Sequence, residues 1–297
     1  MSLPRQVLPG TTYLVTRRCT QRQFLLTPSR QSFVTFLYCL ALAQHATGVQ
    51  IHAVCVLSNH YHLVATDPKA LLPRFVYILN KFVAKCMNAH YGRWENLWAA
   101  GTQASYVRLG DDEAMVDKLA YTVTNPVEAG LVSGSKQWPG LLLWKPARYK
   151  AKRPGWFFHD SGPTPAELWL ELTPLPLGDG ALRPREVMER VGRAIVDKEK
   201  ELRAYMHRAG RAFLGKSVIR RQHHTDSPDT PEPRRGLSPR VASRDKWRRV
   251  EILQRLKSFT EGYRRALSQW LDGDRKTVFP AGTYGLRVEF SVRCADV

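Results

Sequence analysis

The sequence predicts an α+β protein built on a ferredoxin-like sheet, an antiparallel sheet of the split βαβ type with helices on one face. Two observations support this prediction. Over roughly the first 130 residues, a usual domain length, β-branched and aromatic runs alternate with amphipathic segments. Their order is β-α-β-β-α-β, followed by one more helix. The composition then changes and predicts a mainly helical C-terminal extension.

The first half of the predicted sheet domain contains three strands and one helix. Residues 11–19 are β-branched and aromatic and predict a strand. A helix is expected over residues 27–47, because Pro28 suits a first helical turn and the apolar residues keep helical spacing. Residues 49–57 and 60–66 predict two strands joined by a tight turn, and therefore a hairpin.

The second half adds two helices and a strand. The apolar face of residues 69–90 predicts a helix, and residues 104–109 predict the fourth strand. Asp111 and the acids after it favour the start of a third helix, expected over residues 113–124. Its end is expected at Asn125-Pro126, because a residue before proline disfavours helical angles.

Beyond the sheet domain the chain becomes basic and rich in proline. Residues 138–158 mix tryptophans with lysines and arginines, and residues 163–180 predict an irregular crossover. Residues 183–215 are charged and helical in pattern, and residues 247–271 predict an amphipathic helix. A turn sequence within residues 277–292 predicts a short hairpin.

These changes divide the chain into four expected parts. They are a sheet domain (1–150), a basic helical segment (160–222), a flexible proline-rich linker (223–240) and a segment with the last helix and the short hairpin (241–297).

The charge of the chain indicates the class of its partner. Lys and Arg number 45 against 26 Asp and Glu, a formal net charge of +19. Such an excess favours a polyanion, and nucleic acid before an anionic membrane, because no long amphipathic apolar helix is found. No apolar run is long enough to predict a transmembrane helix. The five cysteines form no CxxC pair and no signal peptide is recognisable, so we expect a cytoplasmic protein associated with the nucleoid.

Two histidines in the third strand form a candidate metal site. His60 and His62 are separated by one residue, so their side chains point to the same face of the strand. Two adjacent imidazoles can bind a metal ion, although a third ligand must come from elsewhere. The alternative is a pair of strand-end histidines bonded to backbone groups, and the pair alone does not decide between them.

Tyr121 and Asn125 in the third helix are four residues apart and therefore share a helix face. A tyrosine followed one turn later by an amide suits a nucleophile and an oxygen ligand for a metal. The alternative is that Tyr121 packs in the core and Asn125 caps the helix before Pro126. For these two residues taken alone, that alternative is the better interpretation.

Taken together, the two motifs resemble the single-tyrosine HUH transposases, and among them the REP-associated tyrosine transposases of bacteria. The motifs are Ser58-Asn59-His60-Tyr61-His62-Leu63-Val64 and the stretch from Tyr121 to Val132, Tyr-Thr-Val-Thr-Asn-Pro-Val-Glu-Ala-Gly-Leu-Val. The part from Asn125 to Val132 is the most distinctive. Tyr61 is a polar-tipped version of the bulky hydrophobic residue that the family has between its histidines. The resemblance covers residues 5–150.

The resemblance implies a ferredoxin-like fold and a metal-dependent DNA transposase. His60, His62 and Asn125 would hold a Mg or Mn ion, and Tyr121 would attack single-stranded, hairpin-forming DNA to give a 5′-phosphotyrosine and a free 3′-hydroxyl. A single tyrosine per chain leaves both a monomer and a homodimer open.

Several basic residues are expected to contact the DNA. They are Arg17 and Arg18 at the end of the first strand, Lys81 and Lys85 on the second helix, Lys118 near Tyr121, and Arg148 and Lys150 in the stretch that mixes aromatic and basic residues. For that stretch, packing of its tryptophans onto the domain is the equal alternative. An accessory DNA-binding role is expected for residues 241–297.

Two other functions are compatible with these residues. One is a DNA- or RNA-binding protein derived from such a transposase, without chemistry. The other is a metallonuclease that uses water and forms no covalent intermediate. The presence of His60, His62, Tyr121 and Asn125 together favours the transposase.

Overall fold

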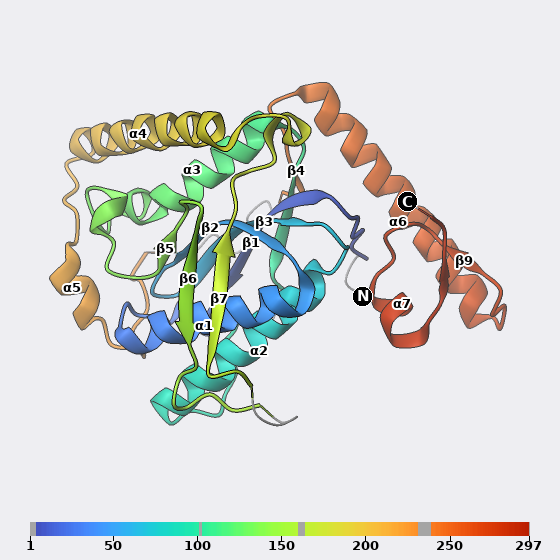
Figure 1. Cartoon of the computed structure of the whole chain (residues 1–297), viewed down its shortest axis with the longest axis horizontal. Coiled ribbons are helices and arrows are strands. Elements are labelled where there is room, and N and C mark those ends of the chain that lie inside the picture. Colours follow the sequence, from blue (N-terminus) through green and yellow to red (C-terminus); the bar gives the residue numbers. More distant parts are fainter. Residues whose placement is uncertain (1–3, 101–102, 160–163, 231–238, 297) are drawn as a thin grey trace.

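The computed structural model describes residues 4–100, 103–159, 164–230 and 239–296. Among these residues an eight-stranded sheet forms the centre of the molecule, in the order β6-β7-β2-β3-β1-β4-β8, with β5 pairing to β2 beside this path (Figure 1). The protein is thus of the predicted α+β class.

The four central strands have the order and direction that the split βαβ pattern predicts. They are β1 (Thr11–Arg18), β2 (Gln50–Val56), β3 (His60–Asp67) and β4 (Ser105–Leu109). Their spatial order is β2-β3-β1-β4, and each pair is antiparallel. The whole sheet is mixed rather than antiparallel, because β7 joins β2 in parallel and β8 joins β4 in parallel.

Helices cover both faces of this sheet, so the prediction of helices on one face was wrong: the helix after the fourth strand and the basic helical segment pack on the second face. The two helices of the split βαβ unit, α1 (Arg30–Thr47) and α2 (Leu72–Tyr91), lie on one face, over the buried side chains of Val15 and Leu63. On the other face, α3 (Asp112–Glu128) and α4 (Pro184–Arg208) pack over Leu14 and Val64. Neighbouring strand residues thus belong to opposite cores, as the alternation of a β-strand requires.

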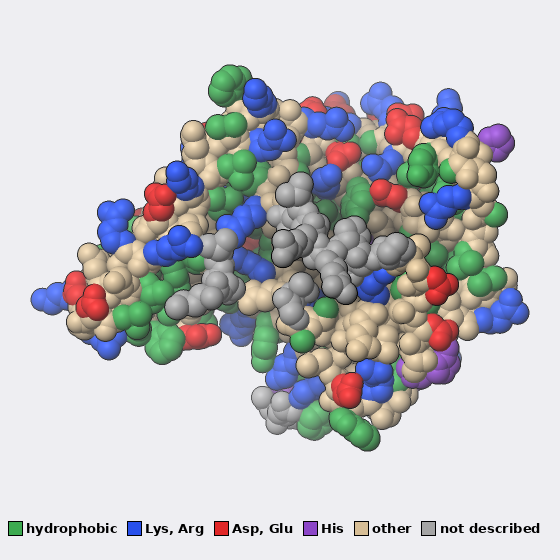
Figure 2. Space-filling view, turned by 180° about the vertical axis from the view of Figure 1, so that it is seen from behind, with side chains coloured by type: hydrophobic (Ala, Val, Ile, Leu, Met, Phe, Trp, Pro, Cys, Tyr) green, Lys and Arg blue, Asp and Glu red, His purple; other side chains and the backbone are tan. Residues whose placement is uncertain are grey.

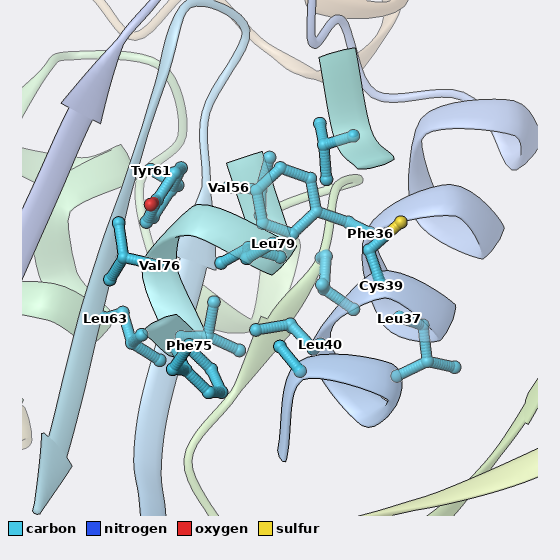
Figure 3. Close-up of a cluster of buried hydrophobic side chains, with 14 of the residues drawn as sticks. Phe36, Leu37, Cys39, Leu40, Val56, Tyr61, Leu63, Phe75, Val76 and Leu79 are labelled. Atoms are coloured by element: carbon cyan, nitrogen blue, oxygen red, sulfur yellow. The ribbon is translucent and has the colours of Figure 1, made fainter. Parts of the chain in front are cut away.

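Tyr61 anchors β3 in the core beneath α1 and α2 (Figure 3). Its side chain is fully buried, and its ring packs edge-on against Phe36 and Trp98. The hydroxyl donates a hydrogen bond of 2.9 Å to Oδ1 of Asn80 on α2. This bond satisfies the polar tip of the residue inside an apolar core.

The third helix extends past its expected end. It continues through Pro126 to Glu128, and Gly130, with a φ of 70°, follows in the left-handed conformation. Proline lacks one N–H, which costs a single hydrogen bond in the last turn. The carbonyl of Pro126 accepts hydrogen bonds from the amides of Leu131 and Val132, at 2.9 and 3.3 Å. Asn125 therefore lies inside the helix.

The sheet also continues beyond residue 150. Strands β5 (Leu142–Leu143), β6 (Ala147–Lys152) and β7 (Glu167–Leu172) extend it past β2. The expected crossover over residues 163–180 therefore contains a strand. In β7, buried leucines alternate with exposed residues, a two-residue period that the flanking prolines obscured in the sequence.

The C-terminal part differs from its prediction in one element. After α5 (Lys216–Arg221), β8 (Val241–Ala242) joins the sheet and α6 (Lys246–Leu271) follows. The expected hairpin is replaced by β9 (Val278–Phe279), α7 (Gly285–Phe290) and β10 (Arg293–Cys294), because β9 and β10 pair in parallel with the helix between them. Residues 231–238 of the expected linker lie outside the described residues.

Three 3₁₀ turns complete the described elements. They are η1 (Thr20–Arg22), η2 (Ser135–Gln137) and η3 (Leu177–Gly180). Within the described ranges, no helix has the length and apolarity needed to cross a membrane.

Asp67, at the end of β3, stabilises the connection between this strand and α2. Its buried carboxylate accepts hydrogen bonds from the amides of Leu71 and Leu72, at 2.8 and 2.6 Å. We expect Asp67→Ala to lower the free energy of unfolding by about 3 kcal/mol, because these buried amides would lose their acceptor. Urea denaturation followed by circular dichroism measures this. Asp67→Asn keeps one acceptor oxygen and should lose less, so equal losses for both variants would contradict this account.

Candidate active site

His60 and His62 lie on the face of β3 opposite Tyr61, beneath α3. Their rings are 4.9 Å apart and nearly perpendicular. The ring of Tyr121, on α3, lies 5.1 Å from the ring of His62, also edge to face. The strand and the helix thus bring the two sequence motifs together at one place, because α3 packs on this face of the sheet.

Hydrogen bonds orient both imidazoles. Nδ1 of His62 lies 2.8 Å from the hydroxyl of Thr16, its register partner on β1. Nδ1 of His60 lies 2.6 Å from Oδ1 of Asn59. When each Nδ1–H donates to its oxygen partner, each Nε2 keeps a lone pair. Nε2 of His62 is buried and has no hydrogen-bond partner among the described residues. Such an orphaned nitrogen is what a missing ligand would complete.

Asn125 connects the histidines to the tyrosine. Its side chain is buried and lies close enough to the ring of His60 and to the hydroxyl of Tyr121 to shift the pKa of both groups. The side chain therefore faces the site instead of capping the helix. The amide of Ala129 bonds to the main-chain carbonyl of Asn125.

Burial controls the protonation of the three titratable groups. Burial lowers the pKa of His60 to about 4. The positive charges of Arg18 and Arg22 lower this pKa further, whereas the Asn125 side chain, which can accept a hydrogen bond from the charged ring, raises it. Burial and the neighbouring His60 lower the pKa of His62 well below its usual value. Both rings are therefore neutral at neutral pH, the form that binds metals.

Burial has the opposite effect on the tyrosine. It raises the pKa of Tyr121 to about 12, and the charge of Glu128 adds to this, while the hydrogen bond from Asn125 opposes it. The phenol is therefore protonated at neutral pH. An attack by its oxygen requires neighbouring positive charge or removal of the proton.

Two ammonium groups lie beside the tyrosine. Nζ of Lys118 and Nζ of Lys198 are 5.7 and 6.0 Å from the centre of the Tyr121 ring. Lys118 also forms an ion pair of 2.9 Å with Asp117. Lys198 belongs to α4, outside the part of the chain covered by the motifs, and no local pattern in the sequence points to it.

Glu128 and Thr16 were also missed by the sequence analysis. Glu128 follows Tyr121 by seven residues and Asn125 by three, a spacing that keeps all three on one helix face and could have identified it. Thr16 could have been found only from the pairing of β1 with β3.

The expected DNA-binding residues are distributed over several surfaces. Arg18 pairs with His60 in the β1–β3 register and shares its face, whereas Arg17 pairs with Tyr61 and points to the other face. Lys118 lies beside Tyr121.

The other four predicted DNA contacts lie away from the histidines. Lys81 and Lys85 belong to α2, on the opposite face of the sheet, where Nζ of Lys85 is 4.9 Å from the ring centre of Phe158. Arg148 and Lys150 lie on β6 at the outer edge, and Lys150 forms an ion pair of 2.7 Å with Glu167.

The tryptophans of residues 138–158 pack against the domain. Trp138 is buried, and its indole N–H donates to the carbonyl of Val56 at 3.1 Å. The indole N–H of Trp156 donates to the hydroxyl of Thr35 at 3.2 Å. For these two residues the packing alternative describes the structure, and stacking on unpaired bases is not their role in this conformation.

The donor atoms of the site suit a divalent metal. Among the described residues no group of three or more His, Cys, Asp or Glu could hold a metal ion. The candidate set instead combines two neutral imidazoles with the amide oxygen of Asn125. Mg²⁺ and Mn²⁺ accept such ligands when water and phosphate oxygens supply the remaining positions. The orphaned Nε2 of His62 agrees with this use.

Comparisons with known proteins give partial structural similarity. A REP-associated tyrosine transposase bound to a REP hairpin is 20% identical and covers 47% of this chain and 81% of that one, with a TM-score of 0.40. A Deinococcus radiodurans R1 protein assigned as a transposase is 16% identical, with coverages of 36% and 85% and a TM-score of 0.27. No protein-family model and no curated protein matches the sequence. Roles for individual residues therefore rest on the geometry of the site.

Thr16 tests whether the histidines form a metal site. We expect Thr16→Val to weaken Mn²⁺ binding by about 10- to 100-fold, because His62 would lose the hydrogen bond that orients its ring. Titration of the protein with Mn²⁺, followed by electron paramagnetic resonance, measures this directly.

The matched control is Thr12→Val. Thr12 lies four residues before Thr16 on β1, where its hydroxyl bonds to that of Thr66 at 2.7 Å and not to a histidine. It should bind Mn²⁺ as the native protein does. Equal weakening in both variants would show that the effect comes from the strand and not from His62.

Proposed function

We propose that this protein is a tyrosine DNA strand transferase that cleaves and rejoins single-stranded, hairpin-forming DNA. The observation that carries the proposal is the contact between two distant motifs. The Tyr121 ring packs on the His62 ring, and the Asn125 side chain lies beside both the Tyr121 hydroxyl and the His60 ring. A core tyrosine would not need an amide and two neutral imidazoles, one of them with an unpartnered nitrogen, at its edge.

His60, His62 and Asn125 are the proposed ligands of a Mg²⁺ or Mn²⁺ ion. When bound, the ion would supply positive charge to the scissile phosphate and offset the charge that develops on it. The hydrogen bonds from Thr16 and Asn59 would hold the two imidazoles in the orientation that binding requires.

Tyr121 is the proposed nucleophile. A bond forms between its phenolic oxygen and phosphorus, while the bond from phosphorus to the 3′-oxygen of the preceding nucleotide breaks. The phenol proton passes to solvent, and the departing 3′-oxygen takes up a proton. The products are a 5′-phosphotyrosine and a free 3′-hydroxyl. The reverse reaction rejoins a strand without ATP, because the covalent bond retains the energy of the one that was broken.

Neighbouring side chains help the phenol to react. Asn125 lies beside the tyrosine hydroxyl and lowers its pKa, and Lys118 and Lys198 bring two positive charges close to the ring. Positive charge at this position stabilises a phenolate as it forms and attracts the DNA phosphate.

The proposed substrate class follows from the charge of the protein. A net charge of +19 favours binding to the phosphate backbone. Arg18 and Lys118 lie on the face of the site and are proposed to position the cleaved strand. Arg17, Lys81, Lys85, Arg148 and Lys150 lie on other surfaces and are proposed to contact more distant parts of the DNA.

Formation of a covalent protein–DNA complex is the decisive measurement. Incubation with a labelled single-stranded hairpin oligonucleotide and Mn²⁺ should give a band of protein-linked DNA on a denaturing gel. Tyr121→Phe should abolish the band, because it removes the attacking oxygen and leaves the ring in place. Chelation of the metal should abolish it as well.

The control is Tyr77→Phe, which removes an exposed phenol from α2 on the opposite face and should leave the band unchanged. Two outcomes overturn the proposal. Cleavage that survives Tyr121→Phe would indicate a metallonuclease that uses water. Binding of the hairpin without cleavage by the native protein would indicate a DNA-binding protein without chemistry.

A further inference from the structure

A second basic site lies at the outer edge of β4, on the face of the sheet opposite Tyr121. A cavity of about 390 Å³ is formed there by β4, the N-terminal segment, the start of α2 and α6. Arg108 on β4 pairs with Tyr13, a residue of the core beneath α1 and α2. Paired side chains share a face, so Arg108 and Tyr106 point away from the histidines. The cavity is therefore separate from the candidate active site.

Arginines dominate the polar lining of this cavity. Arg5, Arg108 and Arg240 line it, and none of the described lining residues is acidic. Within the described ranges, none of the three forms an ion pair. Burial lowers the pKa of Arg5, and the nearby charge of Arg240 lowers it further. Cations brought together without an acidic partner favour the binding of an anion.

The adjoining helix α6 adds to this positive charge. Burial lowers the pKa of Arg108, and so do the charges of Arg248 and Arg255 on α6. The nearby acid is Glu251, and it is already paired with Arg248 at 3.3 Å and with Arg255 at 2.6 Å. Figure 2, which views the molecule from behind, shows Lys and Arg side chains spread over the lobe that holds α6, with fewer acidic ones between them.

Two aromatic rings also line the cavity, those of Tyr13 and Tyr106. The guanidinium of Arg5 lies over the Tyr106 ring, 4.3 Å from its centre, and donates a hydrogen bond of 2.7 Å to the carbonyl of Ala104. Tyr13 meets the same ring edge to face at 6.3 Å. Flat aromatic and guanidinium surfaces stack on unpaired bases, and the volume lies in the range of pockets that bind small ligands.

We propose that this cavity binds one unpaired nucleotide of a DNA strand, with its phosphate on Arg108 and Arg240 and its base against Tyr106 and Arg5. The proposal rests on the proposed function in one respect, that single-stranded DNA is the substrate. It gives the C-terminal segment a specific role. Arg240 and α6 complete a nucleotide site whose other half belongs to the sheet domain.

The test measures binding of a short fluorescent single-stranded oligonucleotide by anisotropy over a range of salt concentrations. We expect Arg108→Gln and Arg240→Gln each to weaken binding about tenfold, because each removes a charged hydrogen-bond donor to phosphate. The slope of log affinity against log salt should fall by about one in each variant. The matched control is Arg265→Gln, which removes the same charge from an exposed position of α6 outside the cavity. It should change neither quantity.

A second measurement locates the base. An oligonucleotide carrying 5-bromodeoxyuridine should crosslink on irradiation to the peptide containing Tyr106, and Tyr106→Leu should lose this crosslink. Melting temperatures confirm that each variant is folded, and Arg240→Gln changes an exposed side chain that the core does not need.

Three results would overturn the proposal. The first is equal weakening by all three arginine variants, which would indicate general charge attraction. The second is unchanged binding in both cavity variants. The third is loss of binding of free deoxyadenosine monophosphate in the cavity variants with oligonucleotide binding unchanged, which would indicate a site for free nucleotides. Failure of the proposed function is recognised separately, by the absence of the Tyr121 adduct from the native protein. The cavity variants can lose binding whether or not that adduct forms.

Discussion

Tyr61 turns into the core beneath α1 and α2, while His60 and His62 on either side of it turn to the opposite face. The buried ring and its hydrogen bond to Asn80 hold β3 in one register, because a shift by one residue would place a histidine in the apolar core and expose the tyrosine. The same register pairs His62 with Thr16 and His60 with Arg18. Every contact of the candidate site depends on this alternation.

The helix that covers the histidines creates an environment of low polarity with two consequences. It keeps both imidazoles neutral, which favours metal binding, and it keeps the Tyr121 phenol protonated, which opposes its use as a nucleophile. Lys118 and Lys198 lie where they can offset the second effect. Their positions agree with a site that binds a phosphate between these two ammonium groups and the neutral side chains of His60, His62 and Asn125.

The C-terminal half of the chain is part of the same molecule and not an appended tail. Helix α4 packs along α3 and brings Lys198 to the tyrosine, and β8 extends the sheet beside β4. Figure 1 shows α6, β9 and α7 as a lobe next to this edge of the sheet. Arg5, Arg108 and Arg240 line one cavity at this junction, and Arg248 and Arg255 of α6 lie near Arg108, so several positive charges meet there.

The sequence by itself determined what local periodicity and spacing encode. The two-residue period placed His60 and His62 on one face of a strand, the helical period placed Tyr121 and Asn125 on one face of a helix, and the order of elements gave the central strand order. Tertiary structure decided what depends on packing between distant segments. It placed α3 over the histidines, turned Asn125 into the site and added β7 to the sheet. It also brought Lys198 to Tyr121 on α3, and Arg240 to the cavity beside β4. No local sequence pattern predicts these contacts, because each depends on how distant segments pack together and not on residues that are neighbours along the chain.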